Sequence, residues 1–193
     1  MSQIKLKHSG GNSVIIAAPD SNPASDRTLK LPSDGDGTIL TTNSSVGKIL
    51  QVVQSYSTAI FSTTSNSMTE YAAINTTITP SSSSNKILIV VSLSVGASDT
   101  AGQGFQLYDG STHISAATNT NVSNNSAMTV QIDSQYDTKQ PAFQYLYSPN
   151  KTSATTIKVY AEADSGRTLY INRYGYGAFR GGGSSMTLME VAA

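Results

Sequence analysis

The stretch KILIVVSLSV, residues 86–95, decides the fold class. It begins as a continuous apolar run and then alternates apolar residues with serine. A short continuous run of β-branched residues is typical of a strand that is covered on both faces, whereas alternation is typical of a strand with one covered face. The sequence therefore predicts that residues 86–95 form a central strand, buried on both faces at its first end.

Other strand-like stretches surround it, and short turn signals separate them. The dipeptide Asp109-Gly110 predicts a tight hairpin, and Ser165-Gly166 predicts another tight turn. No segment of helical length keeps a helical period. The chain is therefore expected to be all-β, with an antiparallel β-sandwich of jelly-roll type over residues 47–193. The predicted strands span residues 48–61, 71–79, 86–95, 104–108, 113–116, 128–137, 142–147, 155–162, 167–172 and 185–191.

Residues 1–46 have a different character from the rest of the chain. Their apolar pieces are only a few residues long, and turns rich in Gly, Pro, Asp and Ser separate them. Such pieces bury too little apolar surface to offset the entropy of ordering them. The segment is therefore predicted to be an extended β arm that pairs with copies of itself or docks on another protein. Its contact residues are expected to be Ile4, Leu6, Val14, Ile15, Leu29, Leu31, Ile39 and Leu40.

Composition argues against several kinds of partner. Twelve basic residues balance twelve acidic ones, and only 12% of the 193 residues are charged. Because Lys and Arg supply most of the affinity for phosphates, nucleic acid is not an expected partner. Cysteine is absent, and no apolar stretch is long enough for a membrane span. We expect no membrane insertion, no signal peptide, no cofactor and no metal.

Residues that could carry catalysis are sparse. His8 and His113 are far apart in sequence, and neither has a recognisable acid partner, so an arm residue and a strand-surface residue are the expected roles. Asp34 and Asp36 resemble the start of a calcium loop, but Ser45 stands where a calcium loop has glutamate. The pair is interpreted as two turns, and a weak cation site stays an alternative. No convincing carboxylate pair indicates a glycan-cleaving enzyme.

The stretch YINRYGYGAFRGGGSSMTLMEV, residues 170–191, holds a glycine-rich loop and a final strand. A phosphate loop needs a helix and a lysine after its glycines, and neither follows here. The alternatives are an exposed binding loop and a packing loop. As binding residues we predict Tyr174, Tyr176, Phe179 and Arg180, because aromatic rings among glycines suit sugar or peptide surfaces. A second polar loop is predicted at Asn119, Asn121, Asn124 and Asn125.

Two parts of the sequence resemble a known family. The segments APDSNPASDRT (residues 18–28) and LKLPSDGDGTILTT (29–42) resemble a segment of tail-fibre and related virion proteins of tailed bacteriophages, including cyanophages. The long stretch that opens with GKILQVVQSYSTAIF at residue 47 is similar to the C-terminal β-sandwich module of the same proteins. The later stretches SATTIKVYAEADSGRTLYINRY (153–174) and SSMTLMEV (184–191) extend that similarity.

The resemblance implies a non-enzymatic, homotrimeric structural protein on the virion surface, made in the host cytoplasm. Its partners would be copies of itself, other virion proteins, and a host surface glycan or protein. Two positions on the particle stay open. One is a tail fibre whose head contacts the host. The alternative is a capsid decoration protein whose arm docks on the major capsid protein and stabilises the shell.

Overall fold

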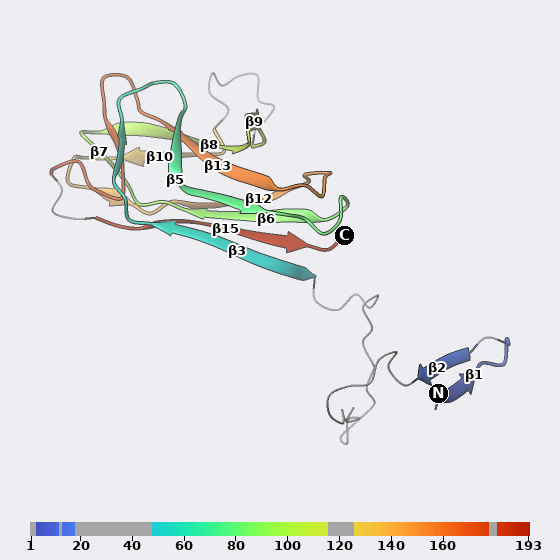
Figure 1. The fold of residues 1–193 in the computed structure, drawn as a ribbon. Helices are drawn as coiled ribbons and strands as arrows, with labels where there is room; N and C mark the ends of the chain where they lie inside the picture. Colours follow the sequence, from blue (N-terminus) through green and yellow to red (C-terminus); the bar gives the residue numbers. More distant parts are fainter. Residues whose placement is uncertain (1–2, 12, 18–47, 116–125, 178–180) are drawn as a thin grey trace. The chain divides into compact units, whose positions relative to one another are not determined.

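A computed structural model describes residues 3–11, 13–17, 48–115, 126–177 and 181–193. The chain divides into two compact units, residues 1–44 and 45–193. The predicted boundary between residues 46 and 47 lies outside the described residues. All described elements are β-strands in antiparallel sheets, which confirms the all-β prediction (Figure 1). No membrane-crossing helix occurs among the described residues.

The first unit contains one described hairpin. Strands β1 (Gln3–Lys7) and β2 (Ser13–Ala17) pair antiparallel, with Leu6 opposite Val14. In the turn, the Gly11 N–H donates to the His8 carbonyl at 3.0 Å, and Gly11 takes a φ of 99° that favours glycine. Leu6 is 59% exposed, and an isolated two-stranded ribbon is marginally stable at best. Of the predicted arm residues, Leu29, Leu31, Ile39 and Leu40 lie outside the described part.

The second unit contains thirteen described strands, whose bounds are as follows. They are β3 (Ile49–Ser57), β4 (Phe61–Thr63), β5 (Thr69–Ile78), β6 (Lys86–Ser92), β7 (Val95–Ala97), β8 (Ala101–Asp109), β9 (Thr112–His113), β10 (Met128–Ile132), β11 (Thr138–Lys139), β12 (Ala142–Tyr147), β13 (Thr155–Glu162), β14 (Leu169–Ile171) and β15 (Ser184–Val191).

These strands form three sheets, in the orders β12-β6-β15-β3, β11-β7-β14-β4 and β10-β8-β13-β5, with β9 added to β8. The small second sheet repeats the order of the first, because each of its strands is the chain neighbour of a strand there. Taken in chain order, the first strand pairs with the last, and pairing moves inward step by step. Thus β3 pairs with β15, β5 with β13, β6 with β12 and β8 with β10.

Several predicted strands are broken in the structure, and those predictions were wrong in length. Residues 48–61 do not form one strand, because the chain leaves β3 at Ser57 and starts β4 at Phe61 in another sheet. Residues 86–95 likewise divide between β6 and β7, with the Leu93 N–H donating to the Pro141 carbonyl. The sequence 128–137 divides into the shorter strand β10 and a turn. Strand propensity continues through these breaks, so only the tertiary pairing reveals them.

The predicted hairpin between β8 and β9 is confirmed, but its turn lies one residue later than expected. Asp109 pairs with Thr112, so the two loop residues are Gly110 and Ser111. Gly110 has a φ of 61°, while Ser111 is not in the left-handed region. A positive φ at the first loop residue alone is the pattern of a type II′ turn rather than the expected type I′ turn.

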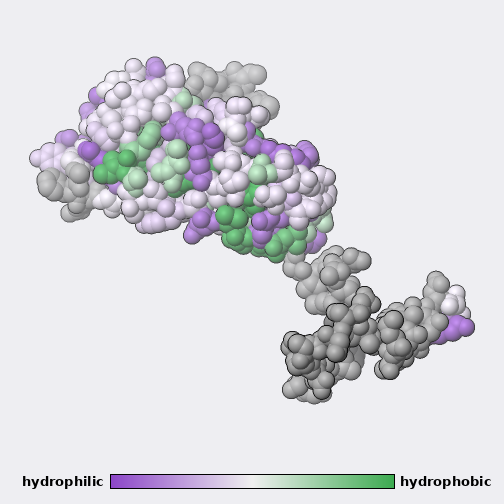
Figure 2. All heavy atoms as spheres, viewed as in Figure 1, coloured by the Kyte–Doolittle hydropathy of each residue, from purple (hydrophilic) through white to green (hydrophobic). Residues whose placement is uncertain are grey.

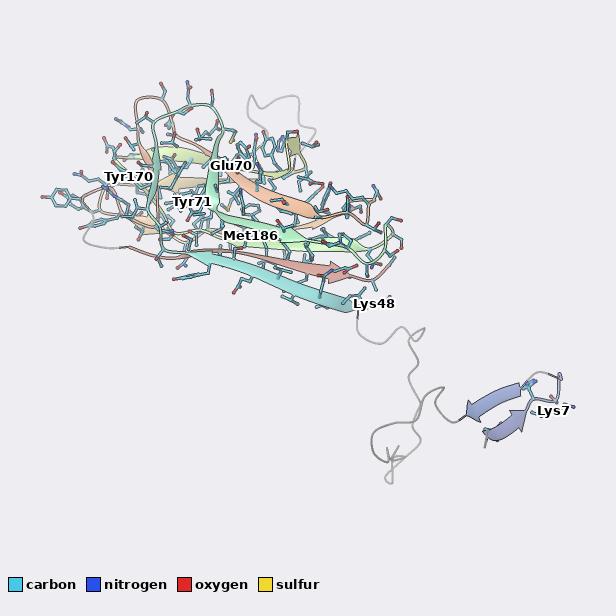
Figure 3. The ribbon with its side chains drawn as sticks, in the orientation of Figure 1. Lys7, Lys48, Glu70, Tyr71, Tyr170 and Met186 are labelled. Atoms are coloured by element: carbon cyan, nitrogen blue, oxygen red, sulfur yellow. The ribbon has the colours of Figure 1, made fainter. Side chains whose placement is uncertain are left out.

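One hydrophobic core fills the second unit. Strand β13 shows the cause, since Thr155, Ile157, Val159 and Ala161 are buried while the alternate residues are half-buried. Tyr71 and Met186 also point into this core (Figure 3). In β6, Ile87, Ile89 and Val91 are buried, but the intervening residues are only half-buried. The predicted burial of that strand on both faces is therefore not seen in the single chain.

Asn172 forms hydrogen bonds to the end of β3 and to the start of β15. It is buried, and its φ of 65° turns the chain out of β14. Its side-chain Nδ2 lies 3.0 and 2.9 Å from the carbonyl oxygens of Ser57 and Ala59, and 2.9 Å from the Tyr71 hydroxyl. Its Oδ1 accepts a bond from the Ser184 hydroxyl at 2.7 Å. One side chain therefore satisfies polar groups at the end of β3 and the start of β15.

We expect Asn172→Ala to destabilise the fold by about 3 kcal/mol, because it leaves buried carbonyl groups without partners and forces alanine into a left-handed conformation. Asn172→Gly loses the same hydrogen bonds but tolerates the backbone, so it should be less destabilising by about 1 kcal/mol. Chemical denaturation measures both free energies of unfolding. Equal losses for both variants would contradict the backbone part of this explanation.

Glu190 is a buried carboxylate whose described partners are all uncharged. Its Oε1 accepts bonds from the Ser81 N–H, the Ser81 hydroxyl and Asn85 Nδ2 at 2.6–2.7 Å. Its Oε2 accepts a bond from Gln51 Nε2 at 2.6 Å. Burial alone raises the pKa of this carboxyl, but the hydrogen bonds from Asn85, Gln51 and Ser81 outweigh burial and hold the pKa at about 2.

Because the pKa of Glu190 is lower in the folded chain than in the unfolded chain, its contribution is present above pH 4.5 and lost as pH falls toward 2. The loss amounts to about 3 kcal/mol of unfolding free energy. Gln51→Ala should weaken this pH dependence, since it removes one donor. Gln54→Ala is the matched control, because its amide donates to Thr187 instead. Denaturation at a series of pH values measures both, and identical profiles would contradict the assignment.

Candidate functional site

The predicted tyrosine loop lies at one end of the second unit, after β14 of the small sheet. Figure 3 labels Tyr170 of β14 at this end. Arg173 and Gly181 form an isolated antiparallel bridge that closes the base of the loop. Residues 178–180, near the middle of the loop, lie outside the described residues.

Arg173 organises the first half of the loop. Its guanidinium carbon lies 4.0 Å from the centre of the Tyr170 ring, within cation–π range. Its Nε donates to the Tyr174 carbonyl at 3.1 Å, and its Nη2 donates to the Gly175 carbonyl at 3.2 Å. The Arg173 side chain therefore binds the backbone of its own loop and fixes the conformation of residues 173–175.

Two glycines allow the loop to lie directly on its neighbours. A Cβ on Gly175 would lie 1.8 Å from the Ala97 carbonyl oxygen, and a Cβ on Gly96 would lie 2.5 Å from the Arg173 carbonyl oxygen. Only glycine fits at such distances. The Tyr176 N–H then donates to the Gln135 carbonyl at 2.9 Å. The loop is thus fixed on the turn that follows β10.

This contact brings two tyrosine rings together on the surface. The rings of Tyr136 and Tyr176 have centroids 4.9 Å apart and an interplanar angle of 44°. The two residues are 63% and 52% exposed, so neither contributes a fully buried side chain. Paired, exposed rings on a fixed backbone present apolar area with hydroxyl groups at its edge. Such a surface suits sugars or peptides.

The structure describes two of the predicted binding residues of the loop. Tyr176 is exposed and Tyr174 is half-buried. Phe179 and Arg180 lie outside the described residues, as do Asn119, Asn121, Asn124 and Asn125, so their predicted binding roles stay predictions. Sequence reasoning missed Tyr136, which lies forty residues before Tyr176 in a stretch predicted as strand. No local signal connects the two.

The histidines have ordinary surroundings in the described chain. His113 stacks on Tyr108 with a centroid distance of 5.1 Å, and its Nε2 lies 3.2 Å from the Ser115 hydroxyl. Burial lowers the pKa of this imidazole. His8 Nδ1 accepts a bond from the Gly10 N–H. No group of three or more potential metal-binding side chains occurs among the described residues. Asp34 and Asp36 lie outside them.

The chain matches no protein-family model, and no curated protein is detectably similar to it.

We expect Gly175→Ala to lower the free energy of unfolding by more than about 2 kcal/mol, because its methyl group would overlap the Ala97 carbonyl. Gly102→Ala is the matched control, since its nearest neighbour is 3.6 Å away, and it should be neutral. Tyr176→Ser should also be near neutral, because the ring is largely exposed. Thermal unfolding measures all three. A large loss for Tyr176→Ser would identify that ring as a packing element.

Proposed function

We propose that this protein is a non-enzymatic, homotrimeric structural protein on the surface of a tailed bacteriophage, of tail-fibre type, whose second unit contacts the host cell. The first support is topological. Pairing of first strand with last and of second with next-to-last is what results when one long hairpin is rolled into two sheets. That is the jelly-roll arrangement, which viral capsid and lectin domains use.

The observation that carries the proposal is an apolar strip on the outer face of the β12-β6-β15-β3 sheet. Val52, Met189, Leu88 and Leu146 lie directly opposite one another across all four strands. Val52 and Leu146 are 57% and 47% exposed, and Leu50 at the edge is 49% exposed. Figure 2 shows a hydrophobic area at the lower edge of the second unit, over the start of β3.

An outer sheet face with this composition is unusual in a single chain, because antiparallel sheets place polar residues on the side that faces water. The other large sheet follows that rule, since its outer face carries Glu70, Lys158 and Glu162. The apolar run of β6 led us to predict burial on both faces. A partner surface on the strip supplies the second cover.

A second copy of the chain is the partner that fits the strip. The strip is self-complementary in chemistry, since apolar residues from one copy can pack against those of another. Ile49 and Leu50, at the edge of the strip, are among the first described residues of the second unit and therefore follow the first unit closely in the chain. The short apolar pieces of the first unit also need cover. Association of three chains about a threefold axis would cover both the strip and these apolar pieces. Such a trimer is closed, so it does not grow into a filament.

The oligomeric state tests the strip. In sedimentation experiments the full chain is expected at about three times its 20.2 kDa mass. The double variant Val52→Glu/Leu146→Glu should dissociate, because two charges per chain would have to be buried. Thr77→Glu/Gln131→Glu is the matched control, with both positions exposed on the other large sheet. A wild-type chain that sediments as a single copy would overturn the trimer.

Quantitative mass spectrometry of purified phage particles tests the place on the virion. A few copies per particle are expected for a tail-fibre protein. Hundreds of copies would instead identify a capsid decoration protein, and the absence of the chain from particles would overturn the proposed function altogether. Host adsorption that falls in the Tyr136→Ser/Tyr176→Ser variant, with an unchanged copy number, would support contact through the tyrosine loop.

A further inference from the structure

The outer face of the β10-β8-β13-β5 sheet holds a shallow groove. Two adjoining hollows, of about 170 and 260 Å³, share Gly102 and Glu162 in their walls. Strand β8 places Gly102 and Gly104 on this face, where Gly102 is exposed and Gly104 is covered by the side chains of Glu162 and Ser126. A Cβ on Gly104 would lie 2.6 Å from both Glu162 Oε1 and Ser126 Oγ. Glycine at 104 therefore lets Glu162 and Ser126 form the wall of the groove, and glycine at 102 leaves the space beside them open.

The groove is lined by groups that form hydrogen bonds. Hydroxyls come from Ser126, Thr129 and Ser165, an amide from Asn66, and carboxylates from Glu162 and Asp164. None of these six side chains carries a positive charge. A ligand for such a surface has to bring hydrogen-bond donors and no negative charge.

An aromatic platform continues the groove along the same strands. On β13, Tyr160 is two residues before Glu162 and faces the same side, opposite Gln106 of β8. The Tyr160 ring lies 4.2 Å, centroid to centroid, from the Tyr108 ring, which in turn stacks on His113. All three rings are half-buried. From Gly102 to Tyr108 the strand advances by about 20 Å, enough for several sugar rings in a row.

Lys158, which lies two residues before Tyr160 on β13, is already engaged. Lys158 Nζ lies 3.1 Å from Glu70 Oε2, and the Tyr160 hydroxyl donates to the same oxygen at 3.1 Å. The bond from Asn75 Nδ2, at 2.6 Å, is the main cause of the lowered pKa of Glu70, so this carboxyl stays ionised beside Lys158. The described part of the platform therefore offers rings and polar acceptors, and its lysine is already paired with a carboxylate rather than open to phosphate or sulfate.

We propose that this face binds an uncharged, hydroxyl-rich glycan that runs along β8 and β13. Sugar hydroxyls donate to the carboxylates and amide of the groove. The apolar face of a sugar ring packs on the exposed part of the Tyr108, Tyr160 and His113 ring cluster, as aromatic side chains with a polar edge allow. This inference deepens the proposed function, because a host surface polysaccharide is the natural source of such a glycan. Binding by the isolated full chain can nevertheless be measured without a particle.

Titration calorimetry with neutral glucan, galactan, mannan and N-acetylglucosamine oligomers tests the site, with sulfated glucan as the charged arm. At least one neutral oligomer should bind, and sulfated glucan should not. Gly102→Leu fills the groove at a position with room for a side chain, and Tyr108→Ser removes a ring. Each should weaken binding about tenfold. Gln54→Ala, at an exposed position on β3 of the other large sheet, is the matched control and should bind like the wild type.

Several results would overturn the glycan site. They are no binding of any neutral oligomer, preferential binding of sulfated glucan, unchanged affinity in both Gly102→Leu and Tyr108→Ser, or an equal loss of binding in Gln54→Ala. Thr129→Leu, at an exposed position in the groove wall, replaces Gly102→Leu if that variant does not fold. If calorimetry fails while the chain is present in particles, only the glycan site is wrong. Glycan binding by a chain absent from particles would overturn the virion role instead.

Discussion

Asn172 is the constraint on which the rest of the second unit depends. All four strands of the β12-β6-β15-β3 sheet are interrupted before the chain enters or leaves the small sheet, and each break frees buried backbone groups. The left-handed backbone of Asn172 and its amide satisfy the ends of β3 and β15 at once. Arg173 and the tyrosine loop follow directly, so the position of the exposed ring pair rests on this buried contact.

The low charge of the chain has a structural counterpart. Carboxylates in charge-poor surroundings need other donors, and Ser, Asn and Gln provide them. Glu190 is held by Ser81, Asn85 and Gln51, and Glu70 receives bonds from both an amide and a lysine. A set of polar, uncharged side chains can therefore stabilise a buried carboxylate such as Glu190, because hydrogen bonds favour the ionised form as nearby cations do.

The two large sheets present opposite chemistry to their surroundings. One carries an apolar strip suited to another copy of the chain, and the other carries a polar groove with an aromatic platform. Successive strands of a rolled hairpin fall in different sheets, so neither surface is continuous in sequence. Val52 and Leu146, for example, lie on opposite edge strands of one sheet. Met189 and Leu88 lie between them and complete the apolar strip. Self-association and ligand binding can thus use separate faces.

Local pattern in the sequence determined the all-β class and the approximate positions of most strands. The alternation of apolar and polar residues over a few positions depends only on neighbouring residues. It predicted β12 and β13 at their observed bounds. Only the tertiary structure decided where long strands break, which strands pair, and that Tyr136 lies beside Tyr176. Those features depend on contacts between residues far apart in the chain, such as Asn172 with Ser57, and propensity carries no information about them.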